Sequence, residues 1–71
     1  MSGRDVVAMA NQIAGAFRAL DEAAAIDATE DHLRKFWDPR MRARLVAALD
    51  AGAASLDPVA RQATLRLSAG S

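Results

Sequence analysis

Histidine and closely spaced carboxylates are the side chains of this sequence that could take part in acid–base or metal chemistry. The single histidine, His32, directly follows a run that contains Asp27, Glu30 and Asp31. A metal site or an activated nucleophile needs further ligands or an orienting partner, and the sequence has no second histidine and no cysteine. Glycine-rich phosphate loops are absent as well. We therefore predict no catalytic residue, no metal ligand and no cofactor-binding residue in this chain.

Recognition of another molecule is the chemistry that residues 32–44 indicate. This stretch holds the only tryptophan, the only lysine and five of the nine basic residues. Tryptophan and arginine are the residue types that most often anchor protein interfaces. Arg40 and Arg42 lie in the first turns of an expected helix, whose positive end is unfavourable to a cation. Their placement is easier to explain if carboxylates or carbonyl groups of a partner bind them. The predicted partner-interface residues are Trp37, Arg40 and Arg42, with His32 and Lys35 nearer the rim.

Two more roles for this stretch stay open at the level of sequence. The arginines could contact phosphates while Phe36 and Trp37 stack on bases, as in a small helical nucleic-acid-binding or regulatory module. The net charge of zero argues against it, because nucleic-acid-binding domains usually carry a basic excess. Arg42 could instead lie over Trp37 as an exposed cation–π pair. Some large side chains must also fill the core, and we expect Leu33 or Phe36 to face inward and Trp37 to face a partner at least in part.

The hydrophobic pattern predicts that helices position this stretch. Apolar residues recur at steps of three and four, the spacing that places them on one face of a helix. No apolar run approaches the roughly 20 residues needed to span a bilayer. The expected helices cover residues 2–20, 22–37, 39–51 and 58–67. The expected fold class is therefore all-α, a small three-to-four-helix array with short Asp-Pro hinges, in a single domain of residues 1–71.

Aspartate followed by proline separates the expected helices at two places, Asp38-Pro39 and Asp57-Pro58. The residue before a proline is pushed out of the helical conformation, and proline is well accommodated at the first helical position. An aspartate in this place can cap the helix that follows. At Asp38-Pro39 we therefore expect a hinge with almost no loop, which fixes the angle between the second and third helices. We expect Gly52 to end the third helix, and a short connection at residues 53–55 to lead to the cap at Asp57.

Polar residues also mark the first helix. Ser2 followed three residues later by Asp5 forms a capping-box pattern. Asn11 and Gln12 are neutral amides that could bond across an interface. Exposed amides are more often solvated, and this is the interpretation that we favour for both.

The large apolar side chains are few for a chain that must fold alone. Hydrophobic residues make up 52% of the 71 residues, but 18 of them are alanine, which fills little volume. Domains of this size without disulfides or metals often depend on a partner for stability. The opening residues lack the apolar stretch of a secretion signal, so we expect a soluble cytoplasmic protein.

Three segments, taken together, resemble a known family. They are residues 9–13 (MANQI), residues 32–42 (HLRKFWDPRMR) and residues 56–58 (LDP). The chain resembles the delta subunit of soluble NAD-dependent formate dehydrogenases over about residues 5–67. The resemblance implies a noncatalytic accessory subunit of a cytoplasmic complex, supporting assembly or stability of the catalytic large subunit.

The resemblance also implies the partners and the cofactors of that complex. The partners would be the large (alpha) subunit together with the beta and gamma subunits, and neither a membrane nor a nucleic acid is expected. Those subunits would hold molybdenum or tungsten on a bis-pterin guanine dinucleotide, iron–sulfur clusters and FMN. The complex would oxidise formate to carbon dioxide and reduce NAD, with no cofactor in the present chain.

Overall fold

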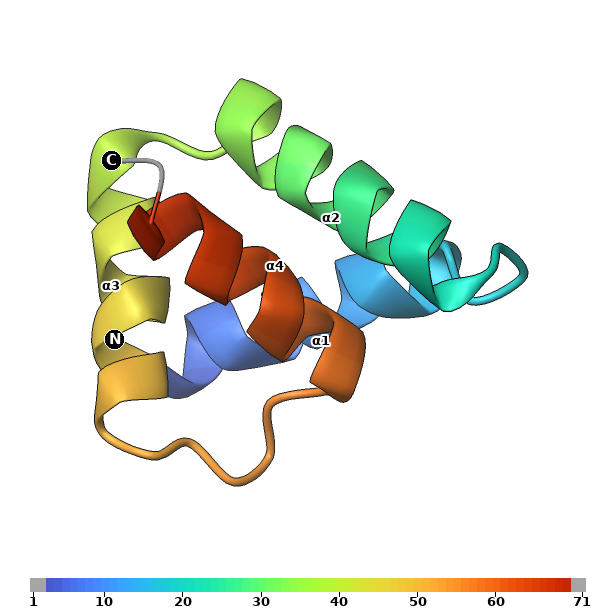
Figure 1. Cartoon of the computed structure of the whole chain (residues 1–71). Coiled ribbons are helices and arrows are strands. Elements are labelled where there is room, and N and C mark those ends of the chain that lie inside the picture. Colours follow the sequence, from blue (N-terminus) through green and yellow to red (C-terminus); the bar gives the residue numbers. More distant parts are fainter. Residues whose placement is uncertain (1–2, 70–71) are drawn as a thin grey trace.

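The computed structural model describes residues 3–69. This part of the chain contains four α-helices and no strands. The helices are α1 (Gly3–Ala16), α2 (Glu22–Phe36), α3 (Pro39–Asp50) and α4 (Pro58–Ala69). In Figure 1, α2 and α4 run side by side, α1 crosses behind them, and α3 stands across one end. The predicted all-α fold is thereby confirmed.

The core draws on all four helices and on the connections between them. Alanine and valine form more than half of it, so the helices can approach closely around a few larger side chains. Two buried threonines belong to the same interior, and each hydroxyl donates to the carbonyl four residues earlier, at 2.7 Å in both cases. The buried core residues are Val6, Val7, Ala10, Ala14, Leu33, Trp37, Leu45, Leu56, Ala60, Ala63 and Leu67.

The first helix ends earlier than the apolar spacing predicts. The expected helix reached residue 20, whereas α1 ends at Ala16 and the next residues form tighter turns, with bonds such as Phe17 N–H to the Ala14 carbonyl at 3.1 Å. The reason is Asp21, whose extended backbone (ψ 164°) lets its carboxylate accept from Ala24 N–H at 2.8 Å and cap α2. The capping-box pattern predicted for Ser2 lies outside the described residues.

Both aspartates cap the helix that the following proline opens, as predicted, and only two residues separate α2 from α3, whereas residues 51–57 connect α3 to α4. Asp38 has an extended backbone (φ −75°, ψ 165°), and its carboxylate accepts from Met41 N–H at 2.9 Å while Pro39 opens α3. Asp57 accepts from Val59 N–H at 2.9 Å at the start of α4. Gly52 follows the end of α3 with a φ of +78°, the left-handed conformation that glycine adopts without a steric cost.

Replacing Asp38 by alanine should destabilise the chain through the loss of this cap. An N-cap of this kind is worth about 1 kcal/mol, which in a domain of this size corresponds to a fall of about 4–8 °C in Tm. Thermal unfolding followed by circular dichroism measures the shift. Asp50→Ala is the matched control, because Asp50 is exposed at the opposite end of the same helix. Equal midpoints for the two variants would show that the cap contributes nothing.

Candidate interaction surface

The structure places Trp37 in the core, and the expectation that its ring faces a partner is wrong. The side chain is only 6% exposed and packs in the shared core. Trp37 follows the fully buried Leu33 by one helical turn, and the backbone N–H of Trp37 donates to the Leu33 carbonyl at 3.1 Å. Both residues therefore face the same side of α2. In a core built largely of alanine and valine, this indole is the largest side chain.

Phe36 takes the exposed position that was expected of Trp37. It is 72% exposed, the highest value among the large apolar side chains described. Its ring lies against that of His32, one turn earlier on α2, with 4.7 Å between centroids and 39° between planes. The spacing of Leu33 and Trp37 was the signal that could have assigned the two aromatic residues correctly, since position 36 is rotated about 100° from position 37 on a helix.

Arg42 binds the end of α2 rather than projecting freely. Its Nη1 donates to the Trp37 carbonyl at 2.8 Å and to the Arg34 carbonyl at 3.0 Å. These are carbonyl groups that a helix leaves without partners at its C-terminus, so the guanidinium caps α2 from α3. The described contacts of Arg42 with Trp37 are thus with the main chain, and the structure does not show the cation–π pair that was the alternative role of Arg42.

The remaining predicted interface residues lie on the surface around the corner between α2 and α3. Lys35 is exposed and pairs with Asp31 one turn earlier at 3.1 Å. Arg40 is exposed in the first turn of α3, and His32 is half-buried under Phe36. Exposed ion pairs such as Lys35–Asp31 contribute little to stability, so these cations can exchange partners at small cost.

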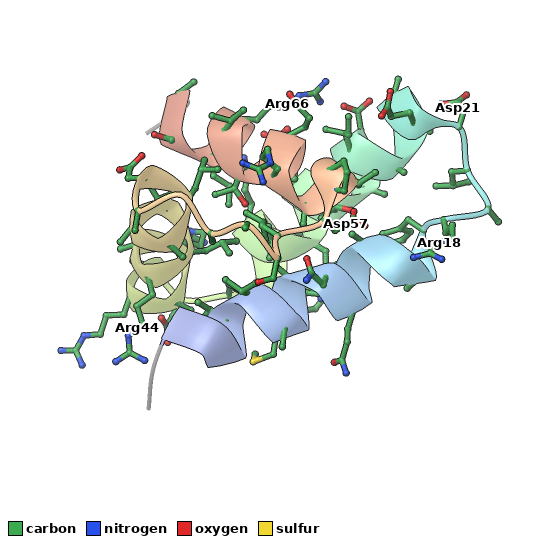
Figure 2. The ribbon with its side chains drawn as sticks, turned by 90° about the horizontal axis from the view of Figure 1, so that it is seen from below. Arg18, Asp21, Arg44, Asp57 and Arg66 are labelled. Atoms are coloured by element: carbon green, nitrogen blue, oxygen red, sulfur yellow. The ribbon has the colours of Figure 1, made fainter. Side chains whose placement is uncertain are left out.

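Part of the acidic stretch pairs inside the chain instead of facing solvent alone. Arg66 of α4, which is labelled in Figure 2, bonds Asp27 and lies 3.6 Å from Glu30. Glu30 also pairs with Arg34 at 2.9 Å. The hydrogen bond with Asp27 raises the pKa of the Arg66 guanidinium above its ordinary value. Arg34 in turn donates to the Arg66 carbonyl at 3.3 Å. The network ties α2 to α4 along their exposed edge.

Asn11 and Gln12 have different roles, although the sequence suggested that both are solvated. Gln12 is exposed, as expected. Asn11 instead bridges to the connection between α3 and α4: its Nδ2 donates to the Ser55 carbonyl at 2.8 Å, and its Oδ1 accepts from Asp57 N–H at 2.7 Å. Figure 2 shows Asp57 over α1 at the start of α4. The amide therefore holds two distant parts of the chain together.

An open groove lies beside the same corner, between the start of α3 and the end of α4. We name it the α3–α4 groove, and its volume is about 530 Å³. Its lining carries two guanidinium groups and no carboxylate. The sequence predicted Arg42 as an interface residue, whereas Arg34 was considered only within the basic cluster that could contact phosphates. The contribution of α4 was missed, because only the packing of the helices brings these residues together. The lining residues are Arg34, Pro39, Arg42, Ala43, Val46, Leu67 and Ser68.

Metal binding and membrane insertion were considered as two further kinds of function. Among residues 3–69, no group of three or more histidine, cysteine, aspartate or glutamate side chains is arranged to hold a metal ion. In the same part of the chain, none of the helices has both the length and the apolar character needed to cross a membrane.

Comparison with known protein families gives a match over most of the chain. A family model described as the NADH-dependent formate dehydrogenase delta subunit FdsD matches residues 5–64. The match contains the central segment 32–42 and both Asp-Pro hinges, and it reaches from α1 into α4. No curated protein and no solved structure matches the chain. Since the family model covers most of the 71 residues, the chain belongs to the family of NADH-dependent formate dehydrogenase delta subunits.

Proposed function

We propose that this chain is a noncatalytic accessory subunit of a cytoplasmic NAD-dependent formate dehydrogenase, and that it supports assembly or stability of the catalytic large subunit. The family match over residues 5–64 is the observation that carries this proposal. The amino-acid sequence supports the proposed noncatalytic role, because iron–sulfur clusters need cysteine ligands and the sequence contains no cysteine. The molybdenum or tungsten pterin, the clusters and FMN would then belong to the alpha, beta and gamma subunits.

The corner between α2 and α3 is the surface that we propose for docking. Phe36 is a large exposed aromatic side chain, and aromatic residues are enriched at the centres of protein interfaces. His32 packs against it, and the exposed Lys35 and Arg40 lie within four residues on either side in sequence. The buried Trp37 supports this corner from inside. The proposed surface thus keeps three of the residues predicted from sequence and places Phe36, not Trp37, at its centre.

Coexpression tests the proposed function directly. The alpha, beta and gamma subunits are produced with and without this chain, purified through a tag on the large subunit, and compared for subunit content, metal content and formate-dependent NAD reduction. We expect the chain to copurify in a fixed ratio, and its omission to lower the yield of active complex.

The chain purified alone provides the complementary measurement. It should oxidise no formate and should carry no stoichiometric metal, flavin or pterin, as judged by elemental analysis and absorbance spectra. Failure to copurify with the large subunit would contradict the subunit assignment. Turnover by the isolated chain would contradict its noncatalytic role.

A further inference from the structure

Among residues 3–69, Arg42 takes part in none of the ion pairs that the structure describes. Arg34 and Arg66 are matched by two carboxylates, those of Asp27 and Glu30. Arg42, in contrast, makes its described hydrogen bonds to neutral carbonyl oxygens. The end of a helix offers a cation only a partial negative charge. The α3–α4 groove therefore presents a net positive charge, on a lining whose other members are mostly apolar.

Both arginines of the groove are held in place before any ligand arrives. Arg42 is fixed by its two bonds to the end of α2, and Arg34 by Glu30 and the Arg66 carbonyl. A guanidinium has five N–H donors on three nitrogens, and the described bonds of Arg42 use Nη1 alone. Its Nε and Nη2 can still donate to a carboxylate. Side chains that are already ordered lose little entropy on binding, which favours a tight contact.

We propose that the α3–α4 groove binds an acidic segment of the catalytic large subunit, and this inference rests on the proposed function. An aspartate or glutamate carboxylate of that segment accepts hydrogen bonds from Arg42 and Arg34. A neighbouring aliphatic side chain of the segment packs against Val46 and Pro39, two apolar side chains of the lining that are not buried. Charge complementarity selects this occupant: the groove pairs two cations with apolar walls, whereas nucleic acid would require a longer basic track.

A carboxylate placed in the groove tests the inference without removing either arginine. Ala43 is exposed and lines the groove, so Ala43→Glu introduces a competing negative charge while leaving the core intact. Ala43→Lys adds similar bulk with the opposite charge. Ala47→Glu is the matched control, because Ala47 is an exposed alanine of the same helix that does not line the groove. Ser68→Glu introduces the charge from α4 and replaces Ala43→Glu if circular dichroism shows that variant to be unfolded.

The affinity of each full-length variant for the purified large subunit gives the result. We expect Ala43→Glu and Ser68→Glu to weaken binding about 30-fold, the scale of an interface hot spot, and Ala43→Lys and Ala47→Glu to weaken it less than about 3-fold. Unchanged binding of both glutamate variants overturns the inference. Equal weakening by lysine and glutamate at position 43 also overturns it, since the groove would then be closed by bulk and not by charge.

Binding of the unaltered chain distinguishes a failure of the groove inference from a failure of the proposed function. If the large subunit does not bind even the unaltered chain, the proposed function has failed and the groove has no partner of this kind. If the unaltered chain binds and the glutamate variants bind equally well, the groove inference alone has failed. Sedimentation of the free chain checks for a second copy as the occupant: a dimer that Ala43→Glu dissociates would overturn the assignment to the large subunit.

Discussion

Replacing Trp37 by alanine is expected to remove about half of the free energy of unfolding of the isolated chain. Removing a buried aromatic side chain of this size costs about 3–5 kcal/mol. The cost includes the free energy of transferring the side chain out of water, which is lost, and the cost of the cavity that remains. At about 0.05–0.15 kcal/mol per residue, a chain of this length has about 4–10 kcal/mol of stability in total. Trp37 is 6% exposed in a core of which more than half the residues are alanine or valine, and these small side chains can fill little of the space that the indole leaves.

The neighbouring aromatic residue provides the matched comparison. Phe36 is 72% exposed, so Phe36→Ala should leave the Tm of the free chain within a few degrees of its original value. At the same time it should weaken binding to the large subunit, because Phe36 stands at the centre of the proposed docking surface. Circular dichroism at 222 nm during heating, and copurification of the same variants, measure the two effects separately.

The two variants together distinguish a core role from an interface role for this segment. We expect Trp37→Ala to lower the Tm by about 15 °C or more. A Trp37→Ala chain that melts like the original would mean that the indole is not a core residue. Full binding by the Phe36→Ala chain would mean that the partner contacts another face of the molecule.

Replacing Asn11 by alanine is expected to cost about 2 kcal/mol. The change removes two hydrogen bonds between α1 and the connection that leads into α4, and it leaves the Ser55 carbonyl and the Asp57 N–H without their partner. These bonds join residues 44 and 46 positions apart, so their loss also loosens the start of α4. Urea unfolding of the variant measures the difference. Gln12→Ala is the control, since Gln12 is the adjacent, exposed amide and its loss should cost less than about 0.5 kcal/mol.

The pH dependence of the stability of an Asn11→Asp variant tests which group donates and which accepts in these two hydrogen bonds. The carboxylate keeps an acceptor for Asp57 N–H but turns a second acceptor toward the Ser55 carbonyl, so the ionised form is disfavoured in the folded chain. Its pKa in the folded state should therefore lie above the value of about 3.9 expected when unfolded. The folded state then binds the proton more tightly, and the stability deficit relative to the original chain should grow as the pH rises from about 4 to 7. A deficit that is constant across this range would show that Asn11 does not donate to Ser55.

Local signals in the sequence were sufficient to predict the helices and the hinges. Asp38 and Asp57 each precede a proline, and an N-cap aspartate acts through backbone groups only two or three residues away. The same is true of Gly52, whose positive φ serves a turn at the helix end. The family resemblance likewise rested on contiguous motifs, and the family match over residues 5–64 confirms it. The early end of α1 was missed because the apolar spacing continues to Leu20, while the cap at Asp21 requires the helix to stop before it.

The all-α fold, the positions of the Asp-Pro hinges and the family could be predicted from the sequence, because each depends on interactions or motifs within a few residues. The packing of the helices was needed to show that Trp37 is buried and Phe36 exposed, that Asn11 holds the connection before α4, and that Arg34 and Arg42 share a groove with Leu67. Each of these depends on which helices pack together and at what angle. Spacing along one helix predicts which residues share a face, but the neighbours of that face come from distant parts of the chain.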